Sequence, residues 1–211
     1  MGSPLPVVGQ AQPGAGRRPK RGRPGYDAER LLSVAVKVFI ERGYDGTTMD
    51  DLAAALGISK SSIYHHASGK KELLSWALDR ALDRLEAVIG EIERLGAPPI
   101  TRLDAAVRSS VRVLLDDLPF VTLLLRVRGN TDIERSALAR RRKIDAEFAG
   151  MVTAAQDAGE LRADVDPQLV ARLVFGAVNS LVEWYRPRRG IGADELVNAL
   201  CAMVFDGLRL K

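Results

Sequence analysis

The stretch "TTMDDLAAALGISKSSIYHH", residues 47–66, holds two helical segments that are each too short to be stable alone. The two segments must therefore pack as a pair. Thr48 followed by Asp51 indicates a variant of the capping box at the first segment, and Ser59 can cap the second. Gly57 lies between them and permits the sharp turn with positive φ that this arrangement needs. The spacing predicts a helix-turn-helix.

The polar positions of the second segment are expected to face outward, while its apolar positions pack against the preceding helix. The outward set is Lys60, Ser61, Ser62, Tyr64 and His65. Short hydroxyls, one cation and an aromatic ring suit a helix that enters the major groove and reaches base edges and phosphates. The alternative is purely structural, with this pair of segments forming only a helical turn inside a bundle core.

The surrounding residues 39–74, FIERGYDGTTMDDLAAALGISKSSIYHHASGKKELL, resemble the DNA-binding domain of the TetR family of transcriptional repressors. The resemblance implies that Thr48 contacts phosphate, that the outward set reads DNA, and that Lys70 anchors the DNA backbone through its charge and the helix-end amides. Two positions depart from the family pattern. Asp50 stands where a basic residue is common, and we expect it to face solvent or to cap a helix. Ala67 stands where an aromatic residue is common, so a smaller side chain fills the space between the recognition helix and the long helix that follows.

The chain has two histidines, and they are adjacent in this segment. Neighbouring helical residues point about 100° apart, so His65 and His66 are poorly placed to grip one metal ion. We expect His66 to pack between helices. No Ser/His/acid set, Cys/His set, metal-ligand spacing or glycine-rich phosphate loop is evident, so we expect neither an enzyme nor a metal or other cofactor.

The leader is strongly basic, whereas the rest of the chain is close to neutral. RRPKRGRP, residues 17–24, carries five cations, and residues outside the leader hold 26 Lys and Arg against 27 Asp and Glu. We expect residues 1–25 to be a disordered arm, because their composition cannot repay the entropy of ordering. Arg21 and Arg23 lie in KRGRP, which resembles an AT-hook that binds the minor groove. The alternative is a solvated, unselective tail.

The body is expected to be all-α, because apolar residues recur at helical spacing and no stretch alternates with a period of two. We predict a helix-turn-helix domain over residues 26–70 and a helical ligand-binding and dimerisation domain over residues 71–211. In the second domain, apolar stripes predict helices at 103–118 and 144–155, with a short apolar turn at 120–127. One cysteine, Cys201, and no signal peptide or membrane span favour a cytoplasmic protein without disulfides.

The TetR resemblance also implies an inducer pocket among the middle helices and dimerisation through the last two. The pocket candidates are Val107, Val111, Leu114, Phe120, Leu124, Met151, Phe175, Asn179 and Trp184. The dimer-interface candidates are Val170, Val174, Ala177, Val178, Leu181, Leu196, Leu200 and Met203. Each pocket candidate could instead belong to ordinary core packing, and Asn179 is the most informative, since an amide in an apolar helix needs a partner.

A basic cluster, residues 140–143, could hold the phosphates of an acyl-CoA or could be a solvated face. Together these features predict a dimeric regulator, a repressor that a small-molecule inducer releases from a palindromic double-stranded DNA operator. The alternative is an architectural DNA-binding protein in which the basic arm dominates minor-groove binding and the body only dimerises.

Overall fold

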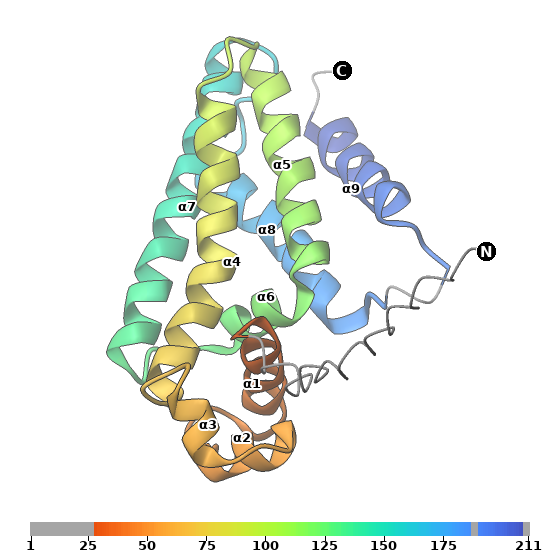
Figure 1. The fold of residues 1–211 in the computed structure, drawn as a ribbon. Helices are drawn as coiled ribbons and strands as arrows, with labels where there is room; N and C mark the ends of the chain where they lie inside the picture. The colour runs from red at the N-terminus through yellow and green to blue at the C-terminus, as the bar shows by residue number, and fades with distance from the viewer. Residues whose placement is uncertain (1–27, 187–189, 209–211) are drawn as a thin grey trace, which may run out of the picture.

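The computed structural model describes residues 28–186 and 190–208, and within them the chain is all-helical, as predicted (Figure 1). The helices in chain order are α1 (Ala28–Arg42), α2 (Met49–Leu56), α3 (Lys60–Tyr64), α4 (Lys70–Glu93), α5 (Pro99–Asp116), α6 (Leu118–Arg126), α7 (Asp132–Asp157), α8 (Pro167–Trp184) and α9 (Ala193–Leu208). None of the described helices is both long enough and apolar enough to span a bilayer.

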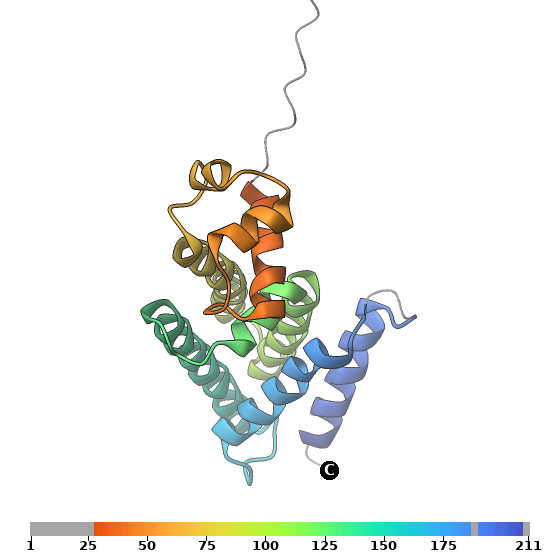
Figure 2. The same ribbon diagram turned by 90° about the horizontal axis from the view of Figure 1, so that it is seen from below.

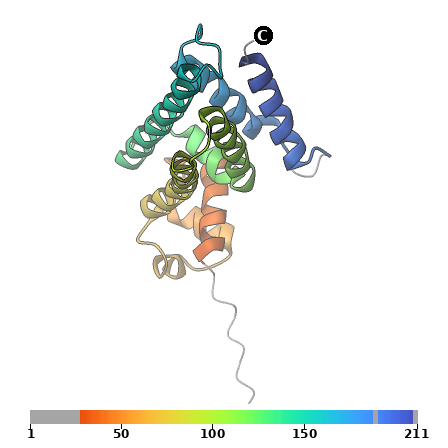
Figure 3. The same ribbon diagram turned by 90° about the horizontal axis from the view of Figure 1, so that it is seen from above.

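The long helix α4 connects the two parts of the fold. Its amino end meets α2 and α3 at one end of the molecule, and the rest of α4 packs against α5, α6 and α7 (Figure 1). In the views from below and above, α7 and α9 lie on opposite sides, with α8 between them (Figures 2 and 3). Helix α9 packs on α5, and α8 packs on α7.

Two helices extend further than the sequence pattern predicted. Helix α7 begins at Asp132, well before the stripe that starts at Ile144, because Thr131 caps it by accepting a hydrogen bond from the Glu134 amide at 3.2 Å. Its amino half carries charge on most of its surface, which hid the helical pattern. Residues 118–126 form the helix α6 instead of only a turn, with Pro at its first turn, where proline is tolerated.

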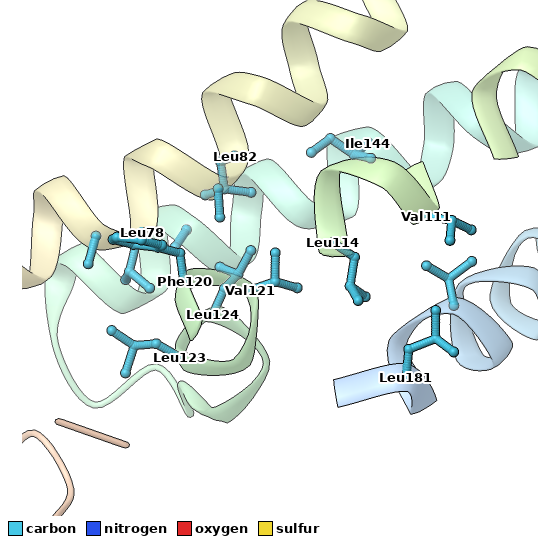
Figure 4. Close-up of a cluster of buried hydrophobic side chains, with 14 of the residues drawn as sticks. Leu78, Leu82, Val111, Leu114, Phe120, Val121, Leu123, Leu124, Ile144 and Leu181 are labelled. Carbon is cyan, nitrogen blue, oxygen red and sulfur yellow. The ribbon is translucent and has the colours of Figure 1, made fainter. Parts of the chain in front are cut away.

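Side chains from α4, α5, α6, α7 and α8 converge in a common apolar core (Figure 4). A charged corner stabilises the edge of this core at the α5–α6 junction. The Asp117 side chain is only 1% exposed and forms ion pairs with Arg80 and Arg84 of α4. Arg80 also pairs with Glu29 of α1 and lies over the Phe120 ring at 4.2 Å from its centroid. This corner ties the first helix to α4 and α6.

Candidate nucleic-acid interface and ligand pocket

The turn between α2 and α3 has the geometry that the sequence predicted. The Thr48 hydroxyl accepts from the Asp51 amide at 3.2 Å, and the Asp51 carboxylate accepts from the Thr48 amide at 2.9 Å, which is a capping box. Gly57 takes the left-handed conformation with φ of 67°. Ser59 then caps α3 by accepting from the Ser62 amide at 3.2 Å. These local devices fix α3 across the end of the molecule.

The outer face of α3 is open. Lys60, Ser61, Tyr64 and His65 are exposed, whereas Ser62 is half-buried. Ile63 on the opposite face is fully buried and anchors α3 in the core. The expectation for His66 is wrong, because its side chain is exposed after the helix has ended. Ala67 is buried, at the place where the smaller side chain was expected.

The cations of this end are paired with nearby carboxylates. The Lys60 ammonium lies 3.0 Å from the carboxylate of Asp50, and this hydrogen bond raises the pKa of Lys60. The Arg42 guanidinium lies 2.6 Å from the carboxylate of Asp51. Hydrogen bonds from Thr48 lower the pKa of Asp51, with Arg42 adding to the effect. Asp50 thus pairs with a candidate DNA-contacting residue.

Lys70, which the resemblance makes a charge anchor for the DNA backbone, is engaged within the protein in this structure. Its ammonium donates to the carbonyl oxygens of Tyr44 at 2.9 Å, Asp45 at 3.3 Å and Thr47 at 2.9 Å. It also lies 4.5 Å from the centroid of the Tyr44 ring. Three donors serve three acceptors, so the side chain holds the α1–α2 loop against α4. The helix-end amides remain as the candidate contact here. Arg21 and Arg23 lie outside the described residues.

A cavity of about 50 Å³ lies among α4, α5, α6, α7 and α8. Four predicted pocket residues line it: Leu114, Leu124, Phe175 and Asn179. Figure 4 shows Leu114, Leu124 and Ile144 in this core. The other candidates lie elsewhere. Val107, Val111, Phe120 and Met151 are buried without lining the cavity, and Trp184 is 50% exposed at the end of α8.

Two charged cavity-lining residues on α7, Arg141 and Asp145, were not predicted from the sequence as pocket residues. Burial lowers the pKa of Arg141 and raises that of Asp145, although each charge partly offsets the effect on the other. A signal for Arg141 exists in the sequence. It stands at helical spacing between Ala137 and Ile144, inside the buried stripe of α7, where an apolar residue is expected.

The basic cluster at 140–143 does not act as a unit. Arg140 forms ion pairs with three α4 carboxylates, Asp79, Asp83 and Glu86, at 3.0, 2.5 and 2.7 Å. Lys143 lies 3.5 Å from Glu147 on its own helix. Two members of the expected phosphate-binding cluster, Arg140 and Lys143, are therefore engaged by acidic residues of the protein.

The last two helices turn most of their predicted interface residues inward. Val170, Val174, Val178, Leu181, Leu196 and Leu200 are each at most 8% exposed within the chain. Val178 and Leu181 belong to the core of the chain, whereas Val170 and Val174 also line a groove between α8 and α9. Leu173 and Met203 are both 64% exposed, and they line the same groove, of about 320 Å³, together with Ala177.

An open recognition helix joined by α4 to a bundle with an internal cavity defines a helix-turn-helix regulator. The model for bacterial regulatory proteins of the tetR family matches residues 31–75. The model for the tetracyclin repressor-like C-terminal domain matches residues 96–208. The chain therefore belongs to the TetR family of transcriptional regulators.

Three similar proteins span nearly the whole chain. The HTH-type transcriptional repressor KstR2 of Rhodococcus jostii is 29% identical over 196 residues, covering 89% of this chain and 93% of KstR2. The crystal structure of SCO3833, a TetR-family member from Streptomyces coelicolor A3, is 55% identical with a TM-score of 0.78, covering 85% and 91% of the two chains. AibR, solved with isovaleryl coenzyme A and operator DNA, is 25% identical with a TM-score of 0.71, covering 84% and 97%.

Proposed function

We propose that this regulator is a homodimeric repressor that leaves a two-fold symmetric operator when a small molecule occupies the α4–α8 cavity. Residues 26–70 form its DNA-binding domain, residues 71–211 form its ligand-binding and dimerisation domain, and residues 1–25 form a basic arm. The protein acts in the bacterial cytoplasm. The observation that carries the proposal is the outward face of α3, presented by two capped helices and the Gly57 turn.

DNA recognition rests on α3. Ser61, Tyr64 and His65 are free to meet base edges, and Lys60 exchanges Asp50 for a phosphate when DNA binds. Thr48 and the amino end of α2 meet the backbone, together with the first amides of α4. Arg21 and Arg23 would strengthen DNA binding, because the arm adds positive charge to a chain that is otherwise close to neutral.

The test of DNA recognition is selection from random double-stranded DNA, run on the full chain and on a chain without residues 1–25. We expect both to select the same two-fold symmetric site, with lower affinity and a smaller salt slope for the truncated chain. An A·T preference without symmetry that disappears with the arm would overturn the repressor and favour the architectural alternative.

Dimerisation rests on the outward face of α8 and α9. Leu169 and Leu173 on α8 and Met203 on α9 leave large apolar side chains in solvent in a single chain. Such a contiguous face favours a partner, and a second copy would bury it symmetrically. We expect a dimer in analytical ultracentrifugation, and Leu173→Glu should give a monomer with at least tenfold weaker operator binding. A dimer that persists unchanged would contradict this face.

The effector signal has a direct path to α3. The cavity contacts α4 through Ala81, Leu82 and Leu85, and Arg140 holds α7 against the same helix. A ligand that moves α7 or α6 therefore shifts α4, whose amino end carries the helix-turn-helix. An acyl-CoA is the inducer class that AibR suggests, since that relative was solved with isovaleryl coenzyme A. Loss of operator binding on addition of acyl-CoA, measured by fluorescence anisotropy, is the expected result.

A further inference from the structure

The polar lining of the cavity is uneven. Ser110 donates its hydroxyl to the Ala106 carbonyl at 2.8 Å and is thereby satisfied. Arg141 and Asn179 line the same cavity, and neither side chain has a hydrogen-bond or salt-bridge partner among the described residues. Partly buried polar groups normally find a partner, and the half-buried guanidinium of Arg141 has lost part of its solvation without a hydrogen bond in return. The cavity therefore offers unused hydrogen-bond donors beside an apolar wall.

The donors have a defined chemistry. A guanidinium has five N–H groups and no acceptor, and an amide adds two more N–H groups and one carbonyl oxygen. Together they fit an oxygen acceptor, best of all a carboxylate or another carbonyl oxygen with partial negative charge. Leu114, Leu124 and Phe175 supply apolar contacts on the remaining wall. Burial lowers the pKa of Arg141, and the nearby charge of Asp145 offsets this effect only in part.

The size of the cavity limits the apolar part of a ligand. A void of about 50 Å³ has room for only a few heavy atoms, since each water-sized atom occupies roughly 10–15 Å³ on this measure. A branched chain of four or five carbons is about as large as this cavity. Longer chains require the helices to move apart.

We propose that the cavity binds the acyl group of a short-chain carboxylic acid or of its thioester, with the acyl oxygen held by Arg141 and Asn179. This inference rests on the proposed effector function and specifies its ligand chemistry. The free acid and the thioester share the acyl oxygen and differ in charge. Asp145 lies one helical turn from Arg141 on α7 and also lines the cavity, so its carboxylate repels a free acid more than a neutral thioester.

The test is calorimetry on the full chain with isovalerate, isovaleryl-CoA, octanoyl-CoA and isoamyl alcohol, which lacks the acyl oxygen. We expect binding of isovalerate, isovaleryl-CoA or both, weaker binding of octanoyl-CoA, and none of the alcohol. Arg141→Met should weaken binding roughly 10- to 100-fold, and Asn179→Leu by about tenfold. Arg141→Lys should recover part of the affinity. Arg142→Met is the matched control, because Arg142 is exposed on the same helix, and it should bind like the wild type.

Asp145→Asn separates the two sources of the acyl oxygen. It should strengthen binding of isovalerate severalfold and leave isovaleryl-CoA unchanged if the free acid is the ligand. If the thioester is the ligand, isovaleryl-CoA binds and isovalerate does not, in both the wild type and the variant. Equal binding of the alcohol, or an unchanged affinity in a folded Arg141→Met protein, would overturn the inference.

Operator binding without ligand, measured on the same samples, keeps the two proposals apart. A chain that binds its selected operator and none of the four probes refutes the acyl site and leaves the regulator intact. A chain that binds isovaleryl-CoA through Arg141 but selects no symmetric DNA site refutes the repressor and leaves the acyl site intact.

Discussion

The two regions joined by α4 treat their polar groups in opposite ways. At its amino end, Lys70 donates to three loop carbonyls, and Lys60 is already paired with Asp50. Further along, α4 borders a cavity in which Arg141 and Asn179 have no hydrogen-bond partner among the described residues. The helix-turn-helix thus pairs its charges locally, whereas the cavity contains two donors without such partners, although other charges along α4 are paired with Arg140 and Asp117.

This difference matches the two kinds of ligand that we propose. A DNA phosphate must compete with Asp50 for Lys60, and an exposed ion pair contributes only about 0–1 kcal/mol, so the exchange costs little. A small ligand must supply its affinity within a few contacts, and unpaired donors inside a protein raise the gain from each one. At the DNA-binding end a phosphate thus replaces an existing partner of a cation, whereas in the cavity a ligand supplies acceptors that the donors lack.

The largest effect on the DNA-binding end is expected from Ile63→Ala. Ile63 is fully buried and is the only buried residue of α3, so its removal should lower the free energy of unfolding by about 2–4 kcal/mol. Operator binding should fall with it, because a five-residue helix has no stability of its own. Urea denaturation gives the stability, and Ser61→Ala on the exposed face is the control that should change it little. A loss under 1 kcal/mol would show that α3 is held by other contacts.

Arg140→Met tests whether the two regions communicate through α7. The ion pairs with Asp79, Asp83 and Glu86 form a network around a side chain that is 24% exposed, and its loss should cost about 1–2 kcal/mol. The variant should still bind operator and acyl ligand but should respond less to ligand, because α7 no longer holds α4. Anisotropy titrations with and without ligand measure this response. An unchanged response in Arg140→Met, with Arg142→Met as control, would place the coupling elsewhere.

The DNA-binding end could be predicted from the sequence because its signals are local. Thr48, Gly57 and Ser59 act on neighbours within three or four residues, and each was confirmed in the predicted role. The prediction that His66 packs between helices was wrong. Whether a side chain is buried just after a five-residue helix depends on contacts with residues distant in sequence. Asp50 was expected to face solvent or to cap a helix, but the structure adds its pairing with Lys60.

The cavity and the terminal helices could be predicted only in part. An apolar stripe shows that a face is buried but not what covers it, so Val178 was assigned to a partner although it also lines the cavity inside its own chain. Leu173, whose side chain is exposed, was not assigned to the interface. Arg141 was grouped with Arg140 by charge, although the two point to different surroundings, the cavity and the α4 carboxylates. Which neighbour a helical residue faces depends on long-range packing.

Gly57→Ala sharpens the comparison at the turn itself. Gly57 has φ of 67°, and a Cβ there would meet nothing within 4 Å, so the cost comes from the backbone alone. We expect a loss of about 1 kcal/mol in the free energy of unfolding. Gly69→Ala is the control, since its backbone is extended and its surroundings are equally open. Equal thermal midpoints for the two variants would show that the left-handed turn is not needed to place α3.

Asp50→Asn should have the smallest effect, and it should raise operator affinity instead of lowering it. Releasing Lys60 from its carboxylate removes the competition with phosphate, and operator affinity should rise about two- to fivefold, since an exposed pair contributes up to about 1 kcal/mol. Asp45→Asn removes the same charge from the nearby exposed loop without freeing Lys60 and should raise affinity less. Salt titrations of operator binding distinguish the two cases, because a freed Lys60 adds up to about 0.9 to the salt slope. If both variants gain equally with the same slope, Asp50 acts only through its net charge, and the idea of partner exchange at α3 is wrong.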